Sequence, residues 1–180
     1  VARDMFSAHG YRAVTMRRVA EKAEVSTRTL YDRFSDKLSL FQACLDFGSL
    51  AFPRIAFEGG RVPVEAALVD YAASLVRMLS TDSSLRLSLV VSREGTEFPE
   101  LVRSADAVQR KYLLLPLAAY MQEAGLAGKD GELRAKLFLA MALAEWQRRY
   151  TFLHPFPQGE EIEHHAAQAV GLFLKGAINT

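Results

Sequence analysis

The sequence is poor in the features that mark several classes of protein. It has one cysteine, Cys44, so no disulfide can form within the chain. We therefore expect a reducing compartment, the cytoplasm, and a buried structural thiol rather than a redox sensor. There is no run of about 18 uncharged apolar residues, so we expect no membrane-spanning helix.

The N-terminal residues, VARDMFSAHG, are charged and amphipathic and do not resemble a signal peptide. Because the chain begins with Val1 rather than methionine, we expect the natural protein to begin upstream.

Motifs that carry catalysis or bind cofactors are also missing. The chain has no nucleophile elbow, no phosphate-binding glycine loop and no paired zinc motif, so we expect no enzyme, no catalytic residue and no cofactor. His164 and His165, with Glu160, Glu161 and Glu163 before them, suggest a metal site. Adjacent helical side chains point about 100° apart, however, so the two imidazoles cannot easily share one ion. A charged, solvated start of a helix explains the segment better, and no bound metal is expected.

Net charge is only +1, but basic residues gather towards the N terminus. Residues 1–47 hold eight Lys and Arg against six Asp and Glu, while residues 48–180 hold fourteen against fifteen. Within residues 11–37 the count is seven against four. This mild asymmetry supports nucleic-acid binding by the N-terminal part without establishing it.

Helix signals recur along the whole chain, and strand signals do not. Apolar residues repeat at helical spacing, which predicts an all-α protein of about nine helices. Gly10 is expected to end the first helix in a left-handed conformation, and Pro116 to kink or split a later helix near Leu115. The predicted helices span residues 1–9, two short segments within 14–34, then 36–52, 64–80, 82–94, 99–124, 131–154 and 160–176, with a connector at 53–63.

The most informative stretch is residues 14–41, which predicts two short helices joined by a tight turn and followed at once by a third. Ser26 and Asp36 can cap the second and third helices by accepting backbone N–H groups, and Thr15 can cap the first. Leu30 lies on the inward face of the second helix, whose outer face is cationic and rich in hydrogen-bond donors. Such a helix has the dimensions and donors to enter a DNA major groove.

The order of residues here is specific enough to resemble a known family. It reads V-T-x-x-x-V-A-x-x-A-x-V-S-x-x-T-L-Y-x-x-F-x-x-K over residues 14–37. This pattern resembles the DNA-binding domain of the TetR family of bacterial regulators, over residues 3–47, and REGTEFPEL at 93–101 resembles, less specifically, a segment of AcrR-like members. Glu24 stands where the turn of the family commonly has glycine, so we expect a non-glycine residue there at an uncommon backbone angle. Arg28 stands where many relatives have a small residue.

The resemblance implies a homodimeric, ligand-responsive transcriptional regulator, which we expect to be a repressor released from operator DNA by a small apolar effector. Residues 1–47 would form the helix-turn-helix DNA-binding domain, and residues 48–180 a helical domain for effector binding and dimerisation. Arg28 is the candidate for reading a guanine edge. The other DNA-binding candidates are Ser26 at the helix start, Thr27, Thr29 and Tyr31 for bases or phosphates, and Thr15, Arg17, Arg33 and Lys37 for phosphates.

Two further sets of residues rest on the same resemblance. Effector-cavity candidates, which ordinary core packing would also explain, are Tyr71, Leu75, Met78, Leu89, Tyr112, Leu115 and Trp146. The last two helices are expected to pair with those of a second subunit, and the candidate interface residues are Ala166, Ala169, Val170 and Phe173.

Two other interpretations stay open. Three amphipathic helices can form a purely structural bundle, so the first alternative is a helical binding or scaffold protein without a DNA role. The second is a metal-dependent helical enzyme, which the missing catalytic motifs disfavour. Salt-dependent DNA binding would separate the first alternative from a regulator, and metal analysis would test the second.

Overall fold

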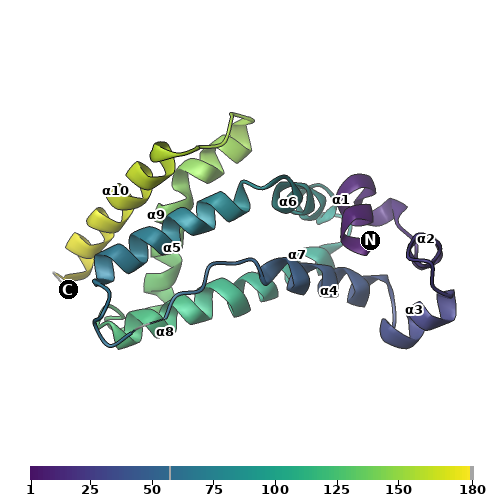
Figure 1. Ribbon diagram of the computed structural model, residues 1–180, viewed down its shortest axis with the longest axis horizontal. Coiled ribbons are helices and arrows are strands. Elements are labelled where there is room, and N and C mark those ends of the chain that lie inside the picture. The colour runs from purple at the N-terminus through teal and green to yellow at the C-terminus, as the bar shows by residue number, and fades with distance from the viewer. Residues whose placement is uncertain (57, 179–180) are drawn as a thin grey trace. The chain divides into compact units, whose positions relative to one another are not determined.

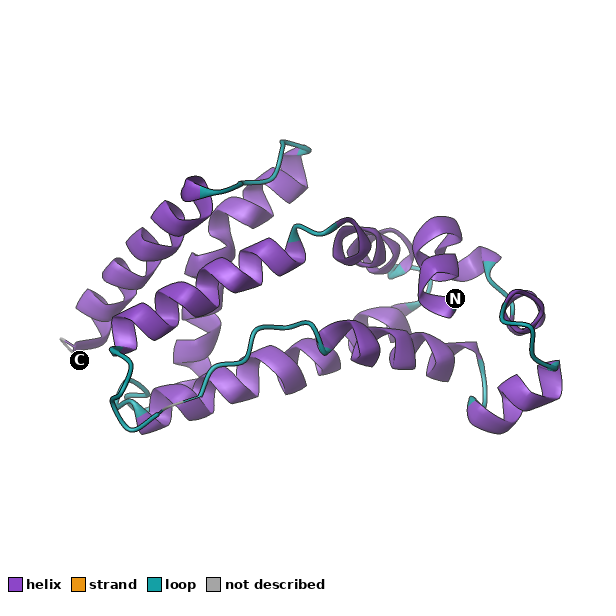
Figure 2. Ribbon diagram, viewed as in Figure 1, coloured by secondary structure: helices purple, strands orange, loops and turns teal. Residues whose placement is uncertain are grey.

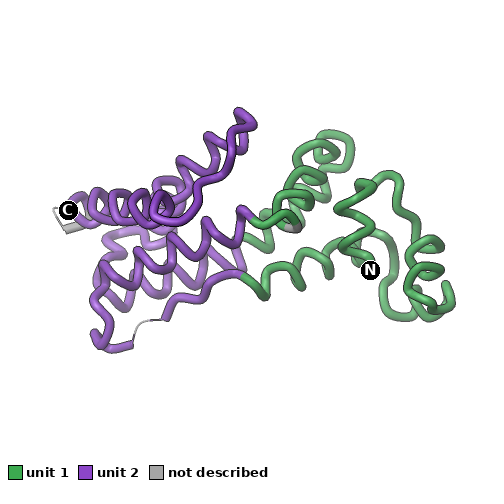
Figure 3. The backbone as a smooth tube through the Cα atoms, turned by 45° about the horizontal axis from the view of Figure 1, so that its top comes forward, with its two compact units in different colours: residues 1–51, 81–109 green, residues 52–80, 110–180 purple. Residues whose placement is uncertain are grey.

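The computed structural model describes residues 1–56 and 58–178, and these residues form helices, turns and loops with no strand (Figures 1 and 2). The all-α prediction is therefore confirmed. The chain forms two compact units, one of residues 1–51 and 81–109 and the other of residues 52–80 and 110–180 (Figure 3).

Each unit is built from helices that are not all consecutive in the chain. The first unit holds α1 (Ala2–Ala13), α2 (Met16–Lys22), α3 (Thr27–Arg33), α4 (Lys37–Ser49), α6 (Asp82–Glu94) and α7 (Pro99–Gln109). The second holds α5 (Val64–Leu79), the π-helical turn η1 (Arg110–Leu114), α8 (Leu115–Glu123), α9 (Gly131–Phe152) and α10 (Glu160–Ile178).

The first unit is larger than the segment expected to bind DNA. α6 packs on α1, and α7 packs on α4, so residues 81–109 belong to the same compact body as the N-terminal helices. Helix packing does not by itself show which part meets DNA, and the functional division at residue 47 stays a prediction.

Three aromatic rings lie in the core of the first unit. Phe6 and Tyr11 of α1 stack with ring centroids 5.8 Å apart, and the ring of Phe41 from α4 meets both edge-on, at 5.2 and 5.4 Å. All three side chains are buried. Cys44, one turn after Phe41, is also buried, as expected, and burial raises the pKa of its thiol to about 11.

Gly10 interrupts α1 where the sequence predicts a left-handed residue, with φ of 82° and ψ of 167°. The chain then makes one further helical turn. The carboxylate of Glu94, at the end of α6, accepts the backbone N–H of Tyr11 at 2.9 Å and that of Arg12 at 2.7 Å. A Cβ atom on Gly10 would overlap the Glu94 carboxylate. Gly10 thus supplies both the backbone angle and the space that this contact needs.

In the second unit, α10 packs on α5 and α9, and α8 packs on α9. The ring of Phe138 on α9 meets that of Phe173 on α10 edge-on, 5.2 Å apart, within the core. No helix among the described residues is long and apolar enough to cross a bilayer.

Pro116 breaks the regular helix, as predicted. It has no N–H to donate to the carbonyl of Tyr112, four residues earlier. The residues before it wind as the π-helical turn η1, and α8 begins at Leu115. A π-helical turn is a common way for a helix to absorb a local break in its hydrogen-bond ladder.

Candidate nucleic-acid interface

All three predicted helix caps are present in the segment that holds α2, α3 and the start of α4. The side chains of Thr15, Ser26 and Asp36 accept the backbone N–H three residues later, at 3.3, 3.0 and 2.7 Å. The N–H of Ser39 holds the pKa of the Asp36 carboxyl below its usual range. These caps define where each helix starts and therefore which side chains of α3 face outward.

The turn between α2 and α3 is tight. Its Glu24 adopts a left-handed conformation with φ of 56°, as predicted from the glycine that relatives commonly have there. The next N–H, that of Val25, donates to the carbonyl of Ala20 at 3.0 Å and closes the turn. A left-handed conformation costs a non-glycine residue about 1 kcal/mol, which the capped helices on either side can support.

α3 has one buried side and one open side. Leu30 is its buried residue, and Phe34, just after the helix, packs partly buried against the core of the first unit. The open side carries Thr27, Arg28, Thr29, Tyr31 and Arg33, all exposed. Figure 1 shows α3 following α2 at an edge of the first unit, with no other helix of that unit covering it.

Most of these exposed side chains keep their hydrogen-bonding capacity free. Within the described residues, Arg28, Tyr31 and Arg33 make no hydrogen bond or ion pair. Thr29 differs, because its hydroxyl lies 2.7 Å from that of Ser26 and takes part in the cap. Arg28 therefore stands near the start of α3 as a long donor without a partner, the geometry that reading a base edge requires.

Two of the cations expected to bind phosphate have partners in the structure. Lys37 Nζ donates to the carbonyl of Tyr11 at 2.9 Å and lies 4.3 Å from the centre of that ring. Burial lowers the pKa of Lys37. Arg17 only meets Glu21 one turn along, at 3.5 Å with both side chains exposed, a pair that DNA can easily displace.

Lys22 is a cation that the sequence interpretation passed over. It is exposed in the last turn of α2 and has no hydrogen bond or ion pair in the part of the chain that is described. The excess of basic residues between positions 11 and 37 indicated nucleic-acid binding by this segment, but it did not distinguish Lys22 from the other cations.

Two known sequence families match the chain. Residues 1–44 match bacterial regulatory proteins of the tetR family, and residues 66–176 match the C-terminal domain of AefR-like transcriptional repressors. The chain belongs to the TetR family.

Individual TetR-family relatives are more distant. The HTH-type transcriptional repressor AcnR of Corynebacterium diphtheriae (strain ATCC 700971) is 32% identical over 94 residues, which are 47% of this chain and 50% of that repressor. The alignment thus spans only half the length of this relative. Among solved structures, the flavonoid-responsive regulator FrrA has a TM-score of 0.81 at 23% identity, over 97% of this chain and 92% of that one. A TetR family regulator from Pseudomonas syringae pv. tomato strain DC3000 has a TM-score of 0.73 at 23% identity, over 97% and 91%.

The residues expected to line a TetR-type effector cavity do not all lie in one unit. Tyr71 and Leu75 on α5 and Trp146 on α9 are buried in the second unit, with Met78 and Tyr112 partly buried there. Leu89 instead belongs to the first unit, on α6, and Leu115 is exposed. We therefore remove Leu89 and Leu115 from the residues proposed to line the effector cavity and retain the other five.

Two of the remaining residues carry buried donors without an acceptor. The Tyr71 hydroxyl and Trp146 Nε1 are shielded from solvent and have no hydrogen-bond partner among the described residues. Burial also raises the pKa of Tyr71. The Trp146 ring stacks with those of Tyr150 and Phe156, at 5.2 and 5.8 Å. An unpaired buried donor costs about 1–3 kcal/mol of stability. A ligand that offers a hydrogen-bond acceptor to either group would remove this cost.

The residues expected at the dimer interface are buried within one protomer. Ala166, Ala169, Val170 and Phe173 face the interior of the second unit, where α10 packs on α5 and α9. These side chains already pack inside the protomer and are not available to a second subunit. We therefore place the proposed interface on the solvent-exposed faces of α9 and α10. There, Leu133 and Leu137 on α9 are 50% and 53% exposed, and Leu172 on α10 is 63% exposed.

The histidine pair does not form a metal site in the structure. His165 Nε2 lies 3.2 Å from the carbonyl of Met141, and His164 is exposed. Among the described residues, no group of three or more His, Cys, Asp or Glu side chains is placed to hold a metal ion.

Proposed function

We propose that the protein is a homodimeric, ligand-responsive regulator of transcription that acts in the cytoplasm by binding operator DNA, and that it is a repressor. The observation that carries the proposal is the open face of α3, where Arg28, Tyr31 and Arg33 are exposed and unpaired within the described residues. Family membership supports the same conclusion. No observation favours a scaffold or an enzyme.

In this proposal α3 lies in the major groove of each half-site. Arg28 makes a bidentate contact with a guanine, and Thr27 and Tyr31 contact bases or phosphates. Arg17, Lys22 and Arg33 bind phosphates and fix the register of the helix on the DNA. Thr15 and Ser26 hold the starts of α2 and α3, whose N-terminal N–H groups favour a nearby phosphate.

The effector is proposed to bind in the second unit and to carry hydrogen-bond acceptors on a mostly apolar body. The unpaired Tyr71 hydroxyl and Trp146 Nε1 support this, because each would gain an acceptor on binding. FrrA is described as flavonoid-responsive, which makes flavonoids a first set of compounds to test. Effector and operator each lower the affinity for the other by the same factor, since the coupling is reciprocal.

A second copy of this chain is the proposed occupant of the open apolar face of α9 and α10. Leu133 and Leu137 lie four residues apart, so they share one side of α9, and the exposed Ala140 and Ala144 continue that side. The small residues allow helices to approach closely, and the leucines supply apolar area. A two-fold axis would place the two α3 helices in successive half-sites.

The direct test is selection of bound DNA from a random duplex pool with the full chain, followed by binding measurements across salt concentrations. We expect an enriched, two-fold symmetric site and a steep loss of affinity as salt rises. Arg28→Ala is compared with the unmodified protein in the same selection. It removes the proposed guanine contact, and the fold should be kept because this exposed side chain makes no hydrogen bond or ion pair in the described structure. If no sequence is enriched and no DNA binding is detected at any salt concentration, the scaffold alternative is supported.

A further inference from the structure

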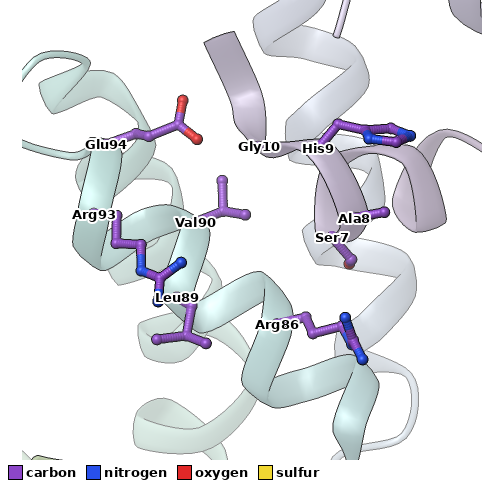
Figure 4. A pocket seen from close by; sticks show the side chains of 9 residues that line it. All are labelled: Ser7, Ala8, His9, Gly10, Arg86, Leu89, Val90, Arg93 and Glu94. Carbon is purple, nitrogen blue, oxygen red and sulfur yellow. The ribbon is translucent and has the colours of Figure 1, made fainter. Parts of the chain in front are cut away.

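A pocket of 320 Å³ opens between α1 and α6, entirely within the first unit (Figure 4). Its volume is at the lower end of the range for sites that bind small molecules. All its lining residues belong to the first unit, whereas the residues proposed to bind the effector belong to the second.

Two of the polar side chains that line this pocket, Arg93 and Ser7, are donors without acceptors among the described residues. Arg93 makes no hydrogen bond or ion pair within the described residues. Arg86 uses its Nε on Asp82, at 2.7 Å, and the structure gives its terminal amino groups no partner among the described residues. Ser7 Oγ is shielded from solvent and likewise has no partner there. Figure 4 shows the Arg86 side chain extending below Ser7 of α1 and the Arg93 guanidinium beside Leu89 of α6.

The carboxylate that lines the pocket is already occupied. Both oxygens of Glu94 accept backbone N–H groups, those of Tyr11 and Arg12. Glu94 forms no ion pair with Arg93 in the described structure, since adjacent side chains on a helix point about 100° apart. Of the two guanidinium groups, that of Arg86 is paired with Asp82, and that of Arg93 has no carboxylate partner among the described residues. An unpaired guanidinium group beside the exposed imidazole of His9 favours an anion.

The pocket also has an apolar part. Leu89 and Val90 of α6 line it together with Ala8 of α1. A hydrated inorganic ion gains nothing from this surface, whereas the hydrocarbon part of an organic anion does. Planar guanidinium groups match the two oxygens of a carboxylate in geometry as well as charge.

We propose that the α1–α6 pocket binds a small organic carboxylate, with its carboxylate on the unpaired Arg93 and its apolar body against Leu89. Such a ligand touches α1 and α6 beside the point where Glu94 holds the backbone after Gly10. Its binding therefore stabilises the packing of these two helices and adds a second ligand site to the one proposed in the other unit.

The test uses benzoate as the probe and benzamide as its uncharged match, titrated into the full-length chain and followed by backbone amide chemical shifts. We expect benzoate to shift the amides of α1 and α6 around Gly10 and Val90, and benzamide to leave them unchanged. Arg93→Gln should weaken benzoate binding by about tenfold, the effect of losing one charged hydrogen-bonded pair. Arg103→Gln, which removes an exposed arginine of the same unit that does not line the pocket, should change nothing.

The proposal would be overturned by no shift with benzoate, by equal shifts with benzamide, or by equal effects of the two arginine variants. Shifts confined to amides of the second unit would place benzoate in the proposed effector region and would equally reject the α1–α6 pocket. Thermal unfolding of each variant shows whether the fold is kept, as expected for two exposed positions. DNA does not enter this experiment, so its outcome is independent of the operator-binding test.

Discussion

The Glu94 carboxylate accepts the backbone N–H of Tyr11, 83 residues earlier in the chain. Gly10, which has no Cβ, leaves room for this contact. On the other side of Tyr11, Lys37 donates to the carbonyl of that residue. Charged side chains from α6 and α4 thus meet at the last turn of α1, shortly before α2 begins at Met16. We therefore expect this junction to help fix the position of the helix-turn-helix segment within the first unit.

Replacement of Gly10 by alanine should therefore destabilise the first unit. The backbone angles at Gly10 belong to a region that is essentially limited to glycine, and the new Cβ would displace Glu94 from its two N–H groups. We expect a loss of at least about 2 kcal/mol in the free energy of unfolding, measured by denaturant titration. Gly48→Ala is the control, because Gly48 is helical with no neighbour near its Cβ position, and it should be neutral or stabilising by up to about 1 kcal/mol.

Lys37→Met distinguishes an internal role for this lysine from phosphate binding. The structure places its ammonium on the Tyr11 carbonyl, so we expect reduced stability and an unchanged salt dependence of DNA binding. Lys22→Met, at an exposed lysine of α2, should do the reverse and lower the salt slope by about one. If Lys37→Met lowers the slope without affecting stability, the lysine leaves Tyr11 to bind phosphate in the complex.

Arg28→Ala should relax the base preference at one position of each half-site and cost about 1–3 kcal/mol of binding to the selected operator. The reason is that a bidentate arginine contact is lost while the helix keeps its cap and its buried Leu30. Competition between the selected site and its single-base variants measures the effect. Selectivity equal to that of the unmodified protein would remove Arg28 from base reading.

Leu137→Glu should convert the dimer into a monomer, because it places a charge on the open apolar face of α9 opposite its symmetry mate. Analytical ultracentrifugation reports the change, and operator affinity should fall with it. Leu50→Glu, at a leucine of the first unit with 61% exposure, is the control and should leave the dimer intact. Ala169→Glu cannot serve this purpose, since Ala169 is buried within the protomer and a charge there would disturb folding.

Acid should weaken the second unit over a defined range of pH. Hydrogen bonds from Arg148 and Arg149 lower the pKa of Glu145 from 4.5 to about 2. A carboxylate with a lowered pKa in the folded state contributes stability above its unfolded value of about 4.5, and that contribution disappears as pH falls towards 2. Glu145→Gln should flatten the pH dependence of the unfolding midpoint between these values. Glu123→Gln, at an exposed carboxylate without an ion pair among the described residues, should leave the profile unchanged.

Local features of the fold could be predicted because they depend on residues close together in the sequence. The caps at Thr15, Ser26 and Asp36 each join positions three residues apart, and the effect of Pro116 follows from a missing N–H. The left-handed Glu24 was expected from the glycine that relatives commonly place there. Such signals give helix starts and turns without knowledge of the tertiary structure.

Features that depend on the tertiary packing could not be predicted in this way. The helical pattern of α10 marked an apolar stripe correctly, but it could not tell whether Ala169 and Phe173 meet their own protomer or a partner. The role of Glu94 requires knowing that α6 packs on α1, although the residue lies within a segment that resembles AcrR-like members. The partner of Lys37 was hidden for the same reason, because Tyr11 lies 26 residues earlier.

The buried thiol of Cys44 makes the chain well suited to site-specific labelling. Maleimides react with the thiolate, and a pKa of about 11 keeps almost none of it at neutral pH, while burial blocks access to what remains. A new cysteine at an exposed position such as Arg33 would therefore carry a spin label or fluorophore alone, with the native residue left in place. In a dimer, one such label per subunit would report the distance between the two α3 helices directly, with and without a ligand.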